Sequence, residues 1–382
     1  MLKSYLLTPG PTPVPANALL EMAKPMIHHR TPEFSAIFKE AAENLQWLFQ
    51  TEEDVMMLAS SGTGAMESAV TNCFNKGDKV IVINGGKFGE RWGQIAEKFG
   101  LKVVWINVEW GEAVDVEMVK SCLEENSDVK GVLVQGIETS TTVAHPVKEI
   151  SELTKDRDAL LVVDGITSVG VTEMPMDEWN IDVLITGSQK ALMLPPGLAF
   201  IALSKKAWAM AENCTTPHYY FDLKKERMNL AKDTTAYTPA VSLINGLNVI
   251  LKGMREEGLS DILKRHDRLA RATRAGVQAL GLKLLAPESP SNCATGFYLP
   301  EDIDGKAFVK TLRDEFGVAM AGGQDHLSGK ILRLAHIGYF TNYDIVIGLS
   351  ALEMGFRKFG SDVEFGKSIA AAQEILIEEY LD

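Results

Sequence analysis

The sequence predicts an α/β protein whose main domain is a mostly parallel sheet covered by helices. From about residue 52 to 205, short runs rich in Val, Ile and Leu alternate with helical stretches. These runs are apolar throughout, as strands are when both faces of their sheet are covered. The chain has 382 residues, enough for two domains. We therefore expect an N-terminal arm at 1–20, a large domain at 21–255 and a smaller C-terminal α/β domain at 256–382.

The expected elements follow in chain order. Residues 9–15 read Pro-Gly-Pro-Thr-Pro-Val-Pro, and the prolines exclude a helix interior or a central strand, so we expect an extended arm. Beyond residue 255, a long helical stretch precedes a mixed α/β region. In the large domain we expect strands at 80–83, 102–108, 131–137, 160–164, 183–186 and 198–203, with helices at 65–74, 88–99 and 116–124.

Charge and composition argue against several classes of protein. The chain carries 38 basic and 51 acidic side chains, a net charge of −13, which disfavours a surface for nucleic acid or anionic membranes. No apolar run is long enough to span a bilayer, and the first residues lack the apolar core of a signal peptide. The four cysteines are far apart, so we expect neither a disulfide framework nor a metal site. A cytoplasmic protein is expected.

Two reactive side chains follow strands of the expected sheet. The strand at 183–186 leads to Lys190, and the strand at 160–164 ends in Asp164. Ligands of parallel sheets lie beyond the carboxyl ends of the strands, and desolvation there favours the neutral, nucleophilic form of a lysine. A lysine and an aspartate so placed suit pyridoxal phosphate, as Schiff-base former and as partner of the pyridinium nitrogen. The alternative is that Lys190 caps a loop and Asp164 caps a turn.

Two segments could bind the phosphate and the ring of such a cofactor. Ser61-Gly62-Thr63-Gly64 precedes a helix, whose N-terminal N–H groups and partial positive charge favour an anion. A plain helix cap is the alternative. Phe88 lies in a glycine-rich loop after a strand, where an aromatic ring could stack on a flat ligand. The alternative for Phe88 is a position in the core.

Two further residues could contact the cofactor and its substrate. Thr139 follows the strand at 131–137, and its hydroxyl could bond the phenolic oxygen of the cofactor, although a Ser/Thr turn is the alternative. Arg333 lies between apolar residues in a strand-like run, where a guanidinium is costly unless it meets an anion. A substrate α-carboxylate would suit its planar fork. A structural ion pair is the alternative for Arg333.

Together these segments resemble the class V pyridoxal-phosphate aminotransferases of the alanine–glyoxylate and serine–glyoxylate (serine–pyruvate) type. The resemblance runs nearly end to end, and the Ser-Gln-Lys segment with its Pro-Pro-Gly turn, one strand after an aspartate, is the most specific part. It implies fold type I, pyridoxal 5′-phosphate in the large domain, no metal, and a homodimer with shared active sites. The matching segments are 9–11, 61–63, 138–140, 163–164, 187–190, 195–197, 237–239 and 332–333.

The resemblance also assigns a role to each residue. Lys190 would be the Schiff-base lysine, and Asp164 would pair with the pyridine nitrogen. Arg333, with backbone near Gly10, would bind the substrate carboxylate. The remaining contacts would be Thr139 at the ring oxygen, Phe88 stacked on the ring, Ser61, Gly62, Thr63 and Gln189 at the phosphate, and Thr238 reaching the phosphate from the partner subunit.

The implied reaction is transamination from a small amino acid, alanine or serine, to glyoxylate or pyruvate. A single confident arginine favours a donor with one carboxylate, whereas Arg30, after His28 and His29, has no assigned place. The alternatives are a donor such as aspartate or 2-aminoethylphosphonate, or a non-catalytic subunit of a larger complex, since some relatives are labelled as subunits of a soluble hydrogenase. Animal peroxisomal relatives have Trp where this chain has Phe88, and a phosphate-contacting Tyr where it has Thr235.

Overall fold

The computed structural model describes residues 3–381 and has a main sheet of seven strands. These are β2 (Val55–Leu58), β3 (Lys79–Asn84), β4 (Lys102–Asn107), β5 (Val129–Gln135), β8 (Leu160–Asp164), β9 (Val183–Gly187) and β10 (Ala199–Leu203). They lie in the order β2-β10-β9-β8-β5-β3-β4. The five strands β9, β8, β5, β3 and β4 are parallel to one another. Strand β10 is antiparallel to both of its neighbours, β9 and β2. The mostly parallel sheet is confirmed.

The strands differ from the sequence prediction at two places. The prediction did not include β2, a short run of four buried residues. The expected strand at 131–137 is divided, because β5 ends at Gln135 and the chain turns at Gly136. The next two residues form β6 (Ile137–Glu138), which pairs with β7 (Val143–Ala144) outside the main sheet. This turn brings Glu138 and Thr139 to the end of the sheet.

Helices cover both faces of the main sheet. In β3, Ile81 and Ile83 pack on one face, in a cluster with residues of α2, α5, α6 and α9, whereas Val80 and Val82 pack on the other, with residues of α3, α4 and α7. This alternation within a fully apolar strand is what a sheet buried on both faces requires. The helices are α2 (Pro32–Phe49), α3 (Gly62–Cys73), α4 (Lys87–Lys98), α5 (Val116–Glu125), α6 (Val147–Thr154), α7 (Lys205–Glu212) and α9 (Val241–Glu257).

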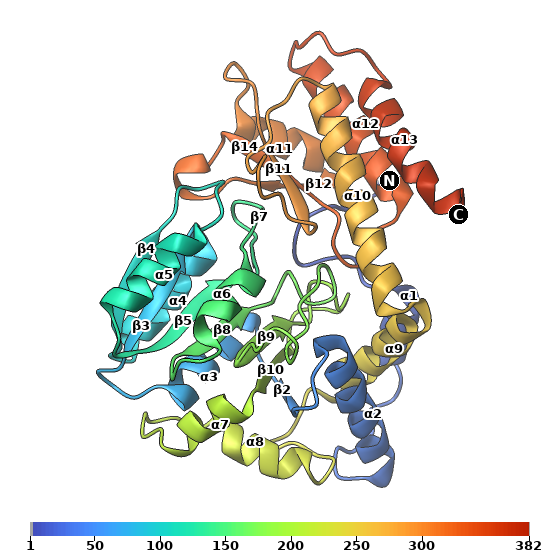
Figure 1. Cartoon of the computed structure of the whole chain (residues 1–382). Coiled ribbons are helices and arrows are strands. Elements are labelled where there is room, and N and C mark those ends of the chain that lie inside the picture. The colour runs from blue at the N-terminus through green and yellow to red at the C-terminus, as the bar shows by residue number, and fades with distance from the viewer. Residues whose placement is uncertain (1–2, 382) are drawn as a thin grey trace.

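The C-terminal part has its own sheet and its own core. Its strands β11 (Ala294–Tyr298), β14 (Ile331–Ala335) and β13 (Ala321–Gly322) are antiparallel. Figure 1 shows this part above the main sheet, with the long helix α10 (Leu259–Ala279) extending down to α9. The boundary expected near residue 255 falls in the last turn of α9, and the division into domains stays a prediction. The other helices here are α11 (Gly305–Asp314), α12 (Asn342–Lys358) and α13 (Lys367–Leu376).

The start of the chain crosses both parts of the molecule. Strand β1 (Tyr5–Leu6) pairs with β12 (Val318–Ala319) of the C-terminal part, so Figure 1 marks both chain ends beside it. Residues 7–15 form neither helix nor strand, as the proline run predicts. The chain then enters α1 (Ala16–Met22), which packs on α9. The arm therefore runs from the C-terminal part to the large domain.

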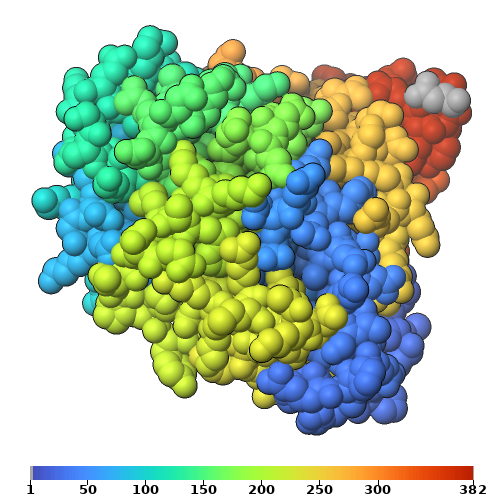
Figure 2. All heavy atoms as spheres, turned by 60° about the horizontal axis from the view of Figure 1, so that its bottom comes forward, coloured from blue at the N-terminus to red at the C-terminus, as the bar shows by residue number. Residues whose placement is uncertain are grey.

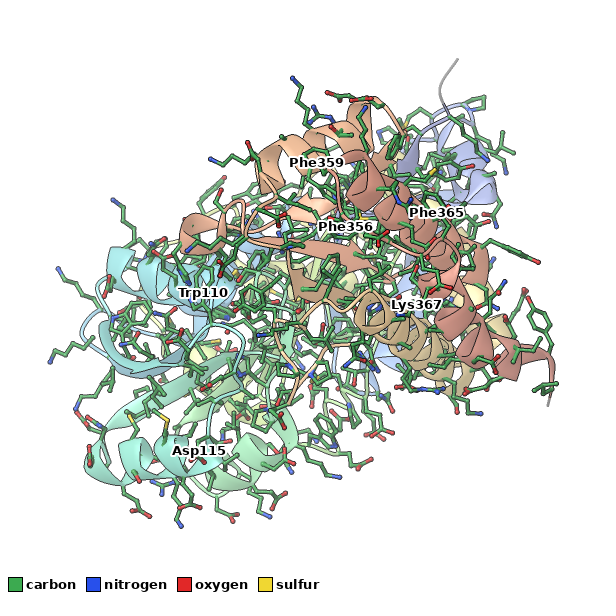
Figure 3. The ribbon with its side chains drawn as sticks, turned by 90° about the horizontal axis from the view of Figure 1, so that it is seen from above. Trp110, Asp115, Phe356, Phe359, Phe365 and Lys367 are labelled. Carbon is green, nitrogen blue, oxygen red and sulfur yellow. The ribbon has the colours of Figure 1, made fainter. Side chains whose placement is uncertain are left out.

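The two parts of the molecule also meet beside the loop after β4. Trp110 on this loop packs against Leu285, Leu327 and Ile331, and its ring centroid lies 4.5 Å from that of His326. Figure 3, seen from above, places Trp110 beside the C-terminal ribbon and labels Phe356 and Phe359 farther along it. This contact links the main sheet to the segment between β13 and β14.

Residues 3–381 contain neither a candidate membrane span nor a candidate metal site. No helix in this range is long and apolar enough to cross a membrane. Nor does this range contain a group of three or more His, Cys, Asp or Glu side chains that could hold a metal ion.

Candidate active site

The ends of two adjacent parallel strands bring the lysine and the aspartate together. Asp164 is the last residue of β8, and Lys190 follows the end of β9 by three residues. Because β8 and β9 are parallel neighbours, their carboxyl ends lie at the same edge of the sheet. Both side chains line one cavity of about 200 Å³. The juxtaposition expected from the sequence is therefore present.

The cavity collects most of the residues that the sequence assigned to the cofactor. Of that set, only Thr238 is absent from its lining. Four lining residues were not assigned: Arg91, Ile137, Ile166 and Thr167. Helical spacing could have indicated Arg91, which follows Phe88 by three residues on α4. The residues of the assigned set that line the cavity are Ser61, Gly62, Thr63, Phe88, Thr139, Asp164, Gln189 and Lys190.

Lys190 lies against the N-terminal arm. Its Nζ donates a hydrogen bond to the Pro9 carbonyl at 2.6 Å. A Cβ on Gly10 would lie 2.1 Å from the same nitrogen, and the φ of Gly10 is +140°. This position therefore requires glycine, both for space and for backbone conformation. Burial lowers the pKa of the Lys190 ammonium to about 8, which favours the neutral, nucleophilic amine.

Asp164 is almost completely buried, with 4% of its surface exposed. Burial raises the pKa of its carboxyl to about 7, although one carboxyl oxygen accepts a hydrogen bond from the Ile166 N–H at 2.9 Å. A cation placed beside this carboxyl would stabilise its ionised form and lower the pKa again. The site is thus prepared for a positively charged partner such as a protonated ring nitrogen.

The start of α3 forms a cradle for an anion. Ser61 occupies the N-cap position, but its side chain makes no capping hydrogen bond, so the capping role left open for it is not realised. A Cβ on Gly62 would lie 2.3 Å from Ile166 Cδ1, which favours glycine at this close approach. The amide oxygen of Gln189 is buried and has no hydrogen-bond partner among the described residues. Free helix N–H groups fit a phosphate group, and the amide of Gln189 would donate to it through Nε2.

A buried carboxylate holds the segment that carries Phe88. Glu138 Oε2 accepts hydrogen bonds from the N–H groups of Phe88 and Gly89, both at 3.0 Å, and its Oε1 accepts one from the Ser140 N–H at 3.1 Å. Burial raises the pKa of the Glu138 carboxyl, and these donors oppose the rise. The Thr139 hydroxyl bonds that of Thr167 at 2.8 Å, so its partner is not the turn backbone. Glu138 thereby joins the start of α4 to the Thr139 turn.

Arg333 is a buried cation without a carboxylate partner. Only 6% of its surface is exposed, and burial lowers its pKa. Its Nη1 donates to the Thr139 carbonyl at 2.7 Å and its Nη2 to the Gly322 carbonyl at 2.9 Å. No carboxylate of residues 3–381 lies within 4.0 Å of it, so the ion-pair alternative is not realised. A positive charge held only by neutral carbonyls suits a substrate carboxylate.

Thr238 lies outside this cavity. It is exposed and lines a surface cavity with Met26, His28 and Pro239. Nearby, Arg30 is exposed and donates to the Thr234 hydroxyl at 3.0 Å, outside the lining of the active-site cavity. Figure 2 shows the blue N-terminal segment beside the yellow-green segment on this face.

The lysine, the aspartate and the anion cradle define a pyridoxal-phosphate enzyme on a parallel α/β fold. The model of the Aminotransferase class-V family matches residues 4–338, and the chain belongs to this family. The expected family, fold type I and aminotransferase activity are thereby confirmed, and pyridoxal phosphate is the cofactor.

Three relatives and one solved structure illustrate the range of the family. The chain is 41% identical to the "soluble hydrogenase, small subunit" of Synechococcus sp. (strain PCC 6716), over 98% of each. It is 34% identical to the L-aspartate–glyoxylate aminotransferase of Paracoccus denitrificans, over 97% of this chain and 95% of the relative. It is 36% identical to the serine–glyoxylate aminotransferase of Hyphomicrobium methylovorum, over 97% of this chain and 94% of the relative. The crystal structure of ureidoglycine–glyoxylate aminotransferase from Bacillus subtilis superposes with a TM-score of 0.94, at 29% identity over 98% of both chains.

Proposed function

We propose that this aminotransferase transfers the amino group of a small amino acid, alanine or serine, to glyoxylate or pyruvate. The observation that carries the proposal is Arg333, a buried guanidinium whose hydrogen bonds within residues 3–381 all go to backbone carbonyls. One such cation can hold the single carboxylate that alanine, serine, glyoxylate and pyruvate share. The acceptor is supported by relatives named for glyoxylate, one of which is also named for serine.

The residues of the cavity have distinct parts in this reaction. The start of α3 and Gln189 would hold the phosphate, and Phe88 and Ile166 are apolar side chains of the lining that would contact the ring. Asp164 would stabilise the positive charge on the ring nitrogen. When bound, pyridoxal phosphate supplies the electron sink that lets the α-carbon of an amino acid lose a proton.

Lys190 moves the proton. Its pKa of about 8 leaves part of the population neutral near pH 7, so Nζ can take the α-proton of the donor and return it to the cofactor side. The Pro9 carbonyl accepts a hydrogen bond from Nζ at 2.6 Å and so keeps the amine beside the N-terminal arm. The same amine is the covalent attachment point of the cofactor in the resting enzyme.

We further propose a homodimer in the cytoplasm, with the phosphate site completed by Thr238 of the partner subunit. Thr238 is exposed and does not line the cavity of its own chain. The surface cavity that Thr238 lines also contains Met26, 69% exposed, together with Ile27, Val241 and Leu243. A contiguous apolar surface is typical of a surface that another chain covers.

Aspartate is the second candidate donor. Arg91, to which the sequence assigned no role, lines the cavity. A second cation could hold the distal carboxylate of aspartate, and one relative is named for aspartate and glyoxylate.

A donor panel tests the proposal. Alanine, serine, aspartate and 2-aminoethylphosphonate are each supplied with glyoxylate, and kcat/KM is measured. We expect alanine or serine to be the best donor and the phosphonate, which has no α-carboxylate, to be poor. If aspartate or the phosphonate exceeds both small amino acids, the small-donor proposal is wrong.

A further inference from the structure

Arg91 is held by two residues that surround the expected cofactor. It lies on α4, three residues after Phe88, so the two side chains share one face of the helix. Its Nη1 donates a hydrogen bond to the Thr63 hydroxyl at 3.2 Å, and its guanidinium carbon lies 4.9 Å from the centre of the Phe88 ring. The guanidinium is therefore fixed between the ring-stacking residue and the start of α3.

Within the part of the chain that the structure describes, no carboxylate compensates the charge of Arg91. Among residues 3–381, no ion pair within 4.0 Å involves it. The other cation that lines the cavity is Lys190, which is committed to the cofactor's reactive end. The residues assigned to the phosphate, Ser61, Thr63 and Gln189, are all neutral. A phosphate ester carries about two negative charges near neutral pH, and Arg91 is the cation that lies next to this neutral cradle.

The hydrogen bond to Thr63 also determines what the threonine can offer. A hydroxyl has one proton to donate and two lone pairs that accept. Because Arg91 occupies a lone pair of Thr63, the hydroxyl proton remains available for an acceptor in the cavity. An arginine so placed makes the threonine a donor toward an anion at the start of α3.

We propose that Arg91 positions the cofactor phosphate, by supplying its positive counter-charge and by orienting the Thr63 hydroxyl as a donor. The proposal rests on the assignment of residues 61–63 as the phosphate site. It also decides between the two candidate donors: an arginine engaged with the phosphate leaves Arg333 as the single arginine for the substrate.

The test compares two ligands that differ only in the phosphate. Dissociation constants for pyridoxal 5′-phosphate and for pyridoxal are measured by equilibrium dialysis, starting from the holoenzyme and following the visible absorption of the bound ligand. Arg91→Met removes the charge and keeps the length of the side chain. Arg91→Lys keeps the charge and loses the planar fork. Lys87→Met is the matched control, since Lys87 lies on the same helix but pairs with Glu90 and Asp325 at 2.5 and 2.9 Å.

We expect Arg91→Met to raise the dissociation constant of pyridoxal phosphate at least ~10-fold, about 1.4 kcal/mol. The dissociation constant of pyridoxal should change by less than about twofold. The dissociation constant of Arg91→Lys for pyridoxal phosphate should lie between those of wild type and Arg91→Met. That of Lys87→Met should equal the wild-type value. Inorganic phosphate should compete with pyridoxal phosphate less effectively in Arg91→Met than in wild type. Circular dichroism identifies a variant that fails to fold, in which case the Arg91→Lys data decide.

Three outcomes would overturn the proposal. Equal weakening of both ligands would show that Arg91 acts on the ring through Phe88 and not on the phosphate. Unchanged affinity for pyridoxal phosphate, with KM raised for aspartate but not for alanine, would make Arg91 a substrate residue. A wild-type protein that binds no pyridoxal phosphate would overturn the proposed function itself, which distinguishes that failure from the first two.

Discussion

The cavity at the end of the main sheet and the surface around Thr238 differ in what one chain completes. In the cavity, Lys190 and Asp164 have pKa values shifted by burial toward about 8 and about 7, and residues 61–63 of the proposed phosphate site line the same cavity. At the other surface, Thr238 is exposed and apolar side chains are uncovered. On our proposal, one chain supplies the lysine and the aspartate that do the chemistry, whereas a second chain completes the phosphate site.

The largest expected effect comes from Lys190 in the cavity at the end of the main sheet. Lys190→Ala removes the amine that moves the α-proton, so turnover should fall to background. Cofactor binding should persist in part, because the anion cradle at residues 61–63 is separate from the lysine. Steady-state transamination and cofactor binding are measured side by side. Near-normal turnover in Lys190→Ala would show that another group moves the proton.

The second effect concerns Asp164. Asp164→Asn keeps the shape of the side chain but cannot stabilise a positive ring nitrogen, so kcat should fall by at least ~100-fold, on the scale of losing one preorganised electrostatic group. Thermal unfolding of the variant checks that the fold is intact. A loss of only a few-fold would mean that a different group holds the charge on the ring.

The third effect tests the substrate side of the same region. Arg333→Lys keeps the charge but loses the paired geometry. Because a hydrogen bond to a charged group contributes roughly 1.5–3 kcal/mol, kcat/KM should fall by about 10- to 100-fold per lost bond. The fall should be similar for alanine, serine and glyoxylate, which present the same carboxylate. A fall confined to one of them would assign Arg333 to side-chain recognition.

The proposed role of Thr238 in the partner's site is tested by mixing two inactive chains. Lys190→Ala supplies an intact Thr238, and a Thr238 variant supplies an intact Lys190. If Thr238 acts across a two-fold interface, random exchange should regenerate about a quarter of the sites in full. Both parents must first be shown to dimerise and to exchange subunits. No recovered activity under these conditions would place Thr238 outside the site, and an active monomer would exclude sharing altogether.

The smallest effect is on the stability of the cofactor-free protein. The Asp164 pKa of about 7 lies above the unfolded value of about 4, so the native state binds more protons between these values and its stability decreases as pH rises through this window. Asp164→Asn mimics the protonated form. Urea unfolding should therefore show the variant more stable than wild type at pH 8, with the difference shrinking toward pH 4. A constant difference across this range would contradict the buried-acid interpretation.

The sequence was most informative where one short segment carries both an element and its chemistry. The apolar strands ending at Asp164 and shortly before Lys190 located the cavity, because parallel strands end at one edge of the sheet. Arg91 and Glu138 were not assigned, because their roles depend on contacts between segments far apart in the chain. Arg91 reaches Thr63, 28 positions away, and Glu138 reaches the N–H of Phe88, 50 positions away. Strand periodicity does not encode such pairings.

The place of Thr238 shows a different limit. Its segment matched the family by resemblance, whereas nothing in its local pattern distinguishes a threonine that serves its own chain from one that serves a partner. The local sequence around Thr235 is equally uninformative. In the structure its hydroxyl donates to the Tyr237 carbonyl at 2.5 Å, within the same loop. Contacts between chains require the assembly, which a single sequence does not contain.

If the cavity at Lys190 and Asp164 holds pyridoxal phosphate and exchanges amino groups through it, the visible absorption spectrum of the purified protein should respond to alanine or serine. We expect a yellow protein whose visible band disappears on adding the donor and returns on adding glyoxylate. A colourless protein whose spectrum does not change with added pyridoxal phosphate would show that the cavity does not bind this cofactor.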